Sequence, residues 1–347
     1  MWVIRQVLLA SAEERMVLAK DVVDHHGRIL LKQGTMLKHE TMRQLDNFQV
    51  VSVWVETTDV DNYEMSIVQE LVSAAARMKL ANTIESAFYS RDGIAAHLPQ
   101  LQDQVSNIAA DIIKRKDALI YIADIGYKCD YLFLHSVNVG LFSMVLGVAM
   151  KLPFEEICQL GMGGFLHDFG KTRIAKEILD KQGPLSLEEF HTVKEHASFG
   201  YNILKAEAEI DHRIMLMALQ HHERPDGKGY PWGLTDNKIH PLAKIVAVAD
   251  VYDALTTDRV YRTRLNPHEA LKNVEAGIGC QFDSAVVHAL QNVAIPYNIG
   301  TAVKLSSGEN GKVIRLNSAN LARPIVATAS GLLNLLFLTE ISVLGFL

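Results

Sequence analysis

Residues 221–231 read HHERPDGKGYP and follow an apolar run with helical periodicity. Two adjacent imidazoles, His221 and His222, stand where that run ends. Two prolines and two glycines then interrupt the helix, which predicts a loop. Imidazoles suit first-row transition metals of borderline softness, although a pair of histidines can also be a solvated helix end. The stretch therefore predicts a helix end with two candidate metal ligands.

A second stretch, residues 164–171, reads GFLHDFGK. An apolar helix is expected to end here in His167 and Asp168, and Gly170 lets the backbone turn so that Lys171 returns one turn later. A carboxylate beside an imidazole can bridge two cations while the imidazole binds one of them. Two metal ions about 3.5–4 Å apart can activate a hydroxide and neutralise the oxygens of a phosphate under attack. Lys171 would then bind a non-bridging phosphate oxygen.

Further candidates occur singly on predicted helices, at His135, His196 and Asp250. A lone histidine on an apolar helix is more often a satisfied core residue than a ligand, so only their joint occurrence favours a metal centre. Arg259 and Arg262 lie three residues apart, on one helical face. Two guanidiniums on one face are typical of a phosphate clamp, although surface charges or ion pairs are the plainer alternative.

Composition narrows the class of protein. The chain has 347 residues, 49% of them hydrophobic, and a formal net charge of -6, without the basic excess of a duplex nucleic-acid binder. Three widely spaced cysteines form no disulfide framework or zinc knuckle. We see no signal-peptide pattern, and the longest apolar stretches, near 139–150 and 331–338, are too short or too interrupted to span a bilayer. We therefore expect a cytoplasmic chain without a membrane span.

Periodicity predicts a mainly α protein with small β-rich units at both ends. The expected domains are a β-rich unit over 1–60, a helical connector over 61–124, a helical domain over 125–294 and a β-rich unit over 295–347. Within them we expect short strands at 17–19 and 28–31, a helix at 40–48, a strand at 50–55, a helix that starts at Pro267, and a hairpin over 300–316. The connector is also a candidate for a homodimer seam, and the first unit is either a sensor or a structural appendage.

Residues 221–231 closely resemble the HHExxDGxGYP signature of the HD-GYP family of bacterial cyclic-di-GMP phosphodiesterases, which are metal-dependent phosphohydrolases of the HD superfamily. The resemblance continues through 245–256 and ends near 258–262. Upstream, His135, residues 167–171 and His196 fall where the family places them, so the match covers about residues 125–294. It implies an all-helical HD-superfamily bundle.

The resemblance also implies roles for individual residues. One metal ion would be held by His135, His167, Asp168 and Asp250. The other would be held by Asp168, His196, His221 and His222, with Asp168 bridging. Asp168 and Lys171 would be catalytic, and the substrate would contact Lys171, Tyr230, Arg259 and Arg262.

The implied cofactors are two divalent metal ions, with Fe or Mn first and Zn, Co or Ni also compatible with these ligands. A metal-bridging hydroxide would open cyclic-di-GMP to pGpG, and GMP would follow if the linear product rebinds. The loop Gly229-Tyr230-Pro231 is linked in the family to contacts with GGDEF-domain proteins.

Two positions depart from the family's pattern. Relatives with three metal ions carry a glutamate where this chain has Tyr131, so we expect two ions. Val260 replaces a proline that is common between the two arginines. The alternative function is a non-catalytic cyclic-dinucleotide receptor or scaffold for GGDEF-domain partners, but no ligand element is missing. A third is an HD hydrolase of nucleotide monophosphates or alarmones, which the intact 229–231 loop disfavours.

Overall fold

The computed structural model describes residues 2–9, 12–24, 28–48, 50, 52–58, 72, 74–90, 93–114, 131–181, 183–207, 209–257, 265, 267–297, 299–317 and 320–346. The chain divides into two compact units. One comprises Met1–Lys79, Tyr121–Tyr131 and Ile295–Leu347, and the other comprises Leu80–Ile120 and Leu132–Ala294. We call the second the helical unit.

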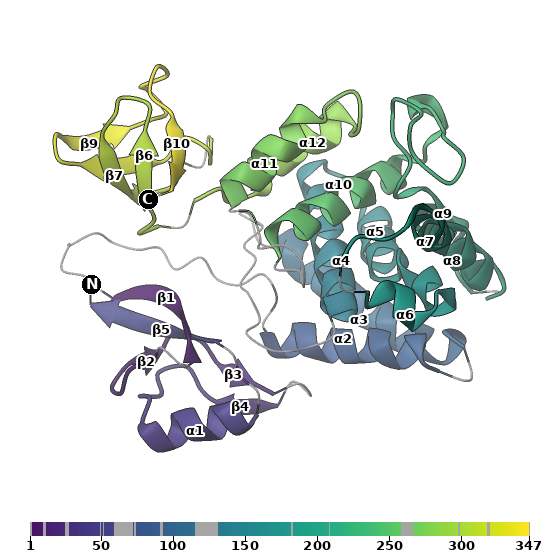
Figure 1. Cartoon of the computed structure of the whole chain (residues 1–347), viewed down its shortest axis with the longest axis horizontal. Helices are drawn as coiled ribbons and strands as arrows, with labels where there is room; N and C mark the ends of the chain where they lie inside the picture. Colours follow the sequence, from purple (N-terminus) through teal and green to yellow (C-terminus); the bar gives the residue numbers. More distant parts are fainter. Residues whose placement is uncertain are drawn as a thin grey trace. The chain divides into compact units, whose positions relative to one another are not determined.

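Helices make up the helical unit (Figure 1). In chain order they are α2 Ala74–Phe88, which begins in the other unit, η2 Ala95–His97, α3 Leu98–Lys114, α4 Tyr131–Ala149, α5 Phe154–Leu166, η3 Phe169–Arg173, α6 Lys176–Leu179, α7 Leu187–Lys194, α8 His196–Lys205, α9 His212–Gln220, η4 Asp236–Lys238, α10 Pro241–Thr256, α11 Pro267–Ala276 and α12 Ser284–Val293. The predicted mainly α class is confirmed, as is the helix start at Pro267. Of the predicted connector, residues 61–71, 73, 91–92 and 115–124 lie outside the described residues.

Helix α5 is central to the packing, because it contacts α3, α9 and α10. Nine of its thirteen residues are buried, which matches its apolar sequence. Its contact with α4 requires glycine on both sides, since a Cβ built on Gly164 would lie 2.5 Å from the Gly140 Cα. This close approach brings the rings of His135 and His167 together, with centroids 5.3 Å apart.

A second glycine contact joins η3 to α8. A Cβ built on Gly170 would lie 1.9 Å from the carbonyl oxygen of His196 and 2.4 Å from the backbone nitrogen of Gly200. Only glycine fits such an approach without moving one backbone away from the other. The contact therefore fixes the segment that follows Asp168 directly against the first turn of α8.

The N-terminal part of the chain forms a small β-rich structure. Its elements are β1 Trp2–Leu8, β2 Val17–Leu18, β3 Val22–Val23, β4 Ile29–Leu31, α1 His39–Asn47 and β5 Ser52–Thr58. The sheet order is β1-β5-β2, both pairs antiparallel, and β3 pairs with β4. Its buried core consists of Leu9, Leu18, Val22, Leu37, Leu45, Val50, Val53 and Val55. The predicted strands and helix are found here, whereas β1 was not predicted.

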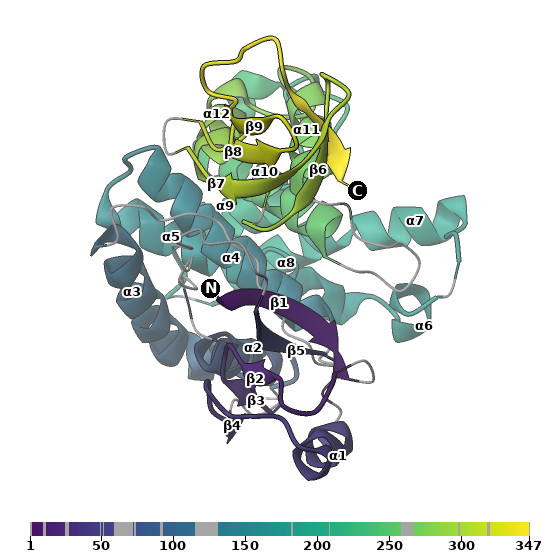
Figure 2. The ribbon, with the colours of Figure 1, turned by 90° about the vertical axis from the view of Figure 1, so that its left-hand side faces the viewer.

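The C-terminal part forms a five-stranded antiparallel sheet of order β10-β6-β7-β8-β9 (Figure 2). Its strands are β6 Ala302–Leu305, β7 Asn310–Arg315, β8 Ile325–Thr328, β9 Gly331–Asn334 and β10 Val343–Phe346. They enclose a core of Tyr297, Val303, Leu305, Val313, Val326, Leu335 and Val343. The predicted hairpin is β6–β7, and the three later strands extend it beyond the prediction.

Among the residues that the structure describes, no helix combines the length and the apolar character needed to cross a membrane.

Candidate metal centre

The candidate ligands converge from five helices of the helical unit. They stand mostly at helix ends: His167 is the residue that ends α5, His196 begins α8, and His221 ends α9. His135 lies on α4 and Asp250 on α10. Of the seven candidate ligands, His222 is half-buried and the other six are buried: His135, His167, Asp168, His196, His221 and Asp250.

Their ligand atoms form overlapping groups, each within 4.8 Å, in which a metal ion can be held. The groups are His135 with His167 and Asp250, His196 with His221 and His222, and His167 with Asp168 and His221. The first two correspond to the two predicted ligand sets without Asp168. The third connects them through Asp168.

The two oxygens of Asp168 face different groups. Oδ1 lies 3.4 Å from Nε2 of His196, and Oδ2 lies 3.3 Å from Nε2 of His167. Oδ2 is also 3.9 Å from Nε2 of His135. A carboxylate placed in this way can give one oxygen to each of two cations.

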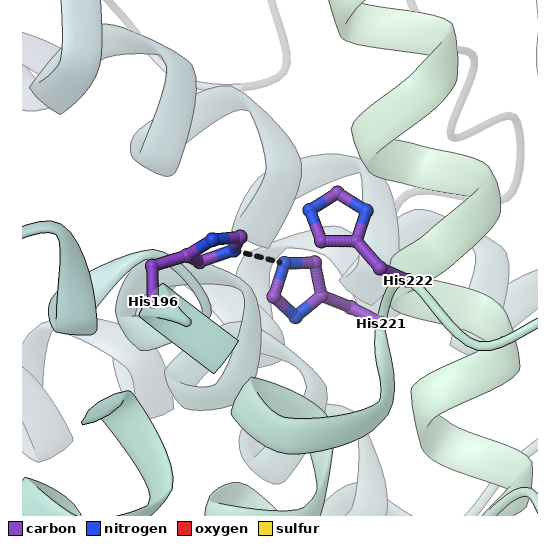
Figure 3. A group of neighbouring side chains, drawn as sticks. All are labelled: His196, His221 and His222. Carbon is purple, nitrogen blue, oxygen red and sulfur yellow. Dashed lines mark hydrogen bonds between the residues drawn. The ribbon is translucent and has the colours of Figure 1, made fainter. Parts of the chain in front are cut away.

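The rings of His196, His221 and His222 lie beside one another (Figure 3). Nε2 of His196 is 3.3 Å from Nε2 of His221, and the ring centroids of His221 and His222 are 4.0 Å apart. Three imidazoles whose ligand nitrogens all lie within 4.8 Å of one another have the arrangement expected around one shared cation.

Backbone carbonyls fix the orientation of three of these rings. Nδ1 donates to the carbonyl three residues earlier in His167 (Gly164 O, 2.7 Å), His196 (Val193 O, 2.6 Å) and His221 (Ala218 O, 2.9 Å). An imidazole that donates through Nδ1 keeps the lone pair on Nε2, which is the usual state of a metal-ligating histidine. Each ring therefore presents an acceptor nitrogen to the centre.

Electrostatics favours the deprotonated form of most of the cluster. Burial, together with the neighbouring imidazoles, holds the pKa of His221 well below its usual value, and burial lowers the pKa of His222 to about 3. Burial alone would raise the pKa of Asp168, but His167 and Lys171 outweigh it and keep that pKa well below the usual range. Neutral imidazoles and an ionised carboxylate are the states that a divalent cation requires.

The pKa of His135 shifts in the opposite direction from those of His221 and His222. Burial acts to lower its pKa, but hydrogen bonds to Asp250 and Asp253 outweigh burial and raise the pKa to about 9. Without a cation, the proton on this ring balances part of the negative charge of the two carboxylates.

A buried oxygen tests whether the residues fit a metal. Oδ1 of Asp168 is buried and has no hydrogen-bond partner among the described residues. A buried carboxylate oxygen without a donor is costly, and cation coordination removes that cost. Imidazole and carboxylate donors suit first-row divalent ions. The residues therefore fit a divalent metal ion beside Asp168.

Two further predicted site residues lie beside this cluster. Nζ of Lys171 donates to Oδ2 of Asp168 over 2.5 Å. The ring of Tyr230 packs on the ring of His222, with centroids 4.6 Å apart and planes at 31°. Burial and the charges of Asp250 and Asp168 raise the pKa of Tyr230, so this phenol stays neutral.

The loop that carries Tyr230 is held by Glu223, a residue to which sequence reasoning gave no role. Its buried carboxylate accepts hydrogen bonds from the backbone nitrogens of Trp232 (2.7 Å) and Leu234 (2.8 Å). Gly229 is required by close packing, since a Cβ there would lie 2.5 Å from the Glu223 Cα. Its position directly after His221 and His222 was the feature of the sequence that could have marked Glu223 as part of the site.

Some predictions fall outside the described part of the chain. Arg259, Val260 and Arg262 are not among the described residues, and the structure describes only the backbone of Tyr131, the first residue of α4. The predicted phosphate clamp and the third-metal argument remain predictions.

A family model described as HD domain matches residues 95–286. The cyclic di-GMP phosphodiesterase PA4108 of Pseudomonas aeruginosa is 34% identical over 237 residues, which is 68% of this chain and 57% of that protein. The cyclic di-GMP phosphodiesterase response regulator RpfG of Xanthomonas campestris pv. campestris is 40% identical over 152 residues, covering 44% of this chain and 39% of that protein.

Among solved structures, Bd1817, described as an HDG"Y"P protein from Bdellovibrio bacteriovorus, aligns with a TM-score of 0.55 at 18% identity, over 83% of this chain and 98% of that chain. This likeness concerns the fold. In this chain, helices bring histidines and aspartates together in a buried cluster that can hold metal, which is the arrangement of HD-type domains. The chain belongs to the HD domain family, and residues 221–231 place it in the HD-GYP branch. It spans less than two thirds of the length of the two curated relatives.

Proposed function

We propose that this chain is a metal-dependent phosphodiesterase that hydrolyses cyclic di-GMP to the linear dinucleotide pGpG. The observation that carries the proposal is the carboxylate of Asp168, whose two oxygens face two separate groups of candidate ligands. The printed activities of the relatives PA4108 and RpfG support the substrate class.

The proposed cofactors are two divalent ions, one on each side of Asp168, with Fe and Mn as the first metals to test. One ion would be held by His135, His167 and Asp250, and the other by His196, His221 and His222. When bound, such a pair activates water for attack on phosphorus and neutralises charge on the phosphate oxygens.

The protein's own residues would position the phosphodiester. Lys171, which is paired with Asp168, would turn its ammonium toward a non-bridging phosphate oxygen, because bound cations would replace it as the counter-charge of that carboxylate. Tyr230 stacks on His222 and would form the wall of the site on that side. Arg259 and Arg262 would bind substrate phosphates through charge-assisted hydrogen bonds.

Metal analysis combined with product analysis tests the proposal. Wild-type protein should hold two ions per chain and convert cyclic di-GMP to pGpG. Asp168→Ala should lose more than one ion and all detectable hydrolysis, because its carboxylate serves both groups. A matched control is Asp180→Ala, which removes an exposed carboxylate near Lys176. An Asp168→Ala variant with both ions and near-normal turnover contradicts the two-metal proposal.

We also propose that the 229–231 loop contacts GGDEF-domain proteins, that the chain acts in the cytoplasm, and that it forms a homodimer. Exposure of the adjacent Trp232, 61% of which is accessible, supports the first of these. Co-purification with a GGDEF domain should be lost in Trp232→Ala while metal content is unchanged. Retention of the complex in that variant would remove this support.

A further inference from the structure

Asp253 is a wholly buried carboxylate on α10, three residues after Asp250. Residues three apart share a helical face, so both aspartates reach the same neighbour, His135 on α4. Oδ1 of Asp250 lies 3.1 Å from Nε2 of His135, and Oδ2 of Asp253 lies 2.6 Å from Nδ1. The two carboxylates hold the two ring nitrogens of one imidazole.

This arrangement differs from that of the other candidate ligands. The rings of His167, His196 and His221 are oriented by backbone carbonyls of their own segments. The ring of His135 is oriented by a side chain 118 residues away in sequence. A single substitution can therefore remove the orienting group of His135 and leave the other three untouched.

The other oxygen of Asp253 is also occupied. Oδ1 accepts a hydrogen bond from Nδ2 of Asn138 (2.9 Å) and one from the hydroxyl of Thr257 (3.2 Å). These two donors fix the carboxylate plane, so Oδ2 remains directed at Nδ1 of His135. A carboxylate held in this way accepts hydrogen bonds only, and the ring nitrogen that faces it must carry the proton.

We propose that Asp253 is a positioning residue of the metal centre: it keeps the proton of His135 on Nδ1 and thereby turns Nε2 toward the ion held with His167 and Asp250. The inference rests on the proposed function, because it concerns one of the two proposed ions. Asp253 touches neither substrate nor metal in this scheme. Partners of this outer kind typically change metal affinity about 10- to 100-fold when removed.

Asp253→Asn separates this role from simple packing. The amide keeps the shape of the side chain but has one acceptor and one donor group. The two donors Asn138 and Thr257 attract the amide oxygen, which turns the amide NH2 toward Nδ1 of His135. That ring nitrogen must then become the acceptor, the proton moves to Nε2, and the nitrogen that should bind metal is blocked.

A second substitution should restore the original tautomer. In Asp253→Asn with Asn138→Asp, the new carboxylate at 138 accepts from the amide NH2, so the amide oxygen again faces Nδ1. This double variant has the same net charge and nearly the same volume as the wild type. Thr257→Val is the matched control, since it removes a donor to Asp253 but leaves the carboxylate beside His135.

The test is a calorimetric titration of metal-free protein with Mn²⁺, which measures the affinity of each ion. Near-ultraviolet circular dichroism checks that each variant is folded. We expect one of the two ions to bind about 10- to 100-fold more weakly in Asp253→Asn, with the other unchanged. The double variant and Thr257→Val should both bind that ion within about fivefold of wild type. Proton-nitrogen spectra of metal-free protein, recorded above the pKa of His135 of about 9 so that the ring is neutral, should show its proton on Nδ1 in the wild type and on Nε2 in Asp253→Asn.

Two outcomes overturn the inference. One is an Asp253→Asn variant with both affinities unchanged, and the other is a double variant as weak as Asp253→Asn. Failure of the proposed function is distinguishable, because it would appear as fewer than two ions bound by the wild type, before any substitution.

Discussion

Gly170→Ala tests how the fold positions the metal centre. An added Cβ would lie 1.9 Å from the carbonyl oxygen of His196, whereas carbon and oxygen normally approach to about 3.3 Å. Relief of this contact requires η3 and α8 to separate by about 1.4 Å. The movement would act between Asp168 and His196, whose Oδ1 and Nε2 atoms are 3.4 Å apart.

Overpacking of this kind costs about 1–3 kcal/mol of folding free energy. Displacement of a site residue by about 1 Å costs roughly 100-fold in rate, so kcat/KM for cyclic di-GMP should fall by at least that factor. Urea unfolding, metal analysis and hydrolysis assays measure the three effects. Gly345→Ala is the control, because a Cβ there meets nothing within 4 Å. Wild-type metal content and turnover within threefold in Gly170→Ala would refute the argument.

Further predictions concern substrate, metal number and pH. Arg259→Ala or Arg262→Ala should raise KM and leave both ions in place, because each variant loses a charged hydrogen bond to the substrate worth about 1.5–3 kcal/mol. Unchanged KM and kcat in both variants would count against the clamp. Tyr131→Glu should add a third ion, since a carboxylate one turn before His135 can reach a cation beside the pair; a variant that still binds two, or a wild type with three, contradicts this. Because the pKa of His135 is about 9 without metal, the ion on that ring must displace a proton, and its affinity should rise about tenfold per pH unit from pH 7 toward 9 and then level off. Titrations that give equal affinity at pH 7 and 9 would exclude this coupling.

Local patterns made the centre predictable. His167 and Asp168 end an apolar helix, and His221 and His222 end another, so their chemistry could be inferred from adjacent residues. The helical unit then gathers these residues with His135, His196 and Asp250. The resemblance to the HD-GYP signature supplied the pairing of distant candidates, which periodicity alone does not give.

Non-local contacts explain what the sequence did not reveal. Strand β1 contains the polar pair Arg5 and Gln6, which interrupts its apolar pattern, and it is a strand because it pairs with β5. Asp253 lies 118 residues from His135, so its role depends on how α10 packs near α4. Its spacing from Asp250 was a usable signal, since two acidic residues one turn apart on a buried helix need partners. Glu223 was marked by its position directly after the two histidines, but its partners are backbone nitrogens of Trp232 and Leu234, and which nitrogens it binds depends on how the loop folds.

Anomalous X-ray diffraction from crystals of the chain loaded with Mn²⁺ tests most directly whether Asp168 bridges two metal ions. We predict two anomalous peaks about 3.5–4 Å apart, one on each side of the Asp168 carboxylate. One peak should lie beside His135, His167 and Asp250, and the other beside His196, His221 and His222. A single peak, or two peaks that share no contact with Asp168, would contradict the account.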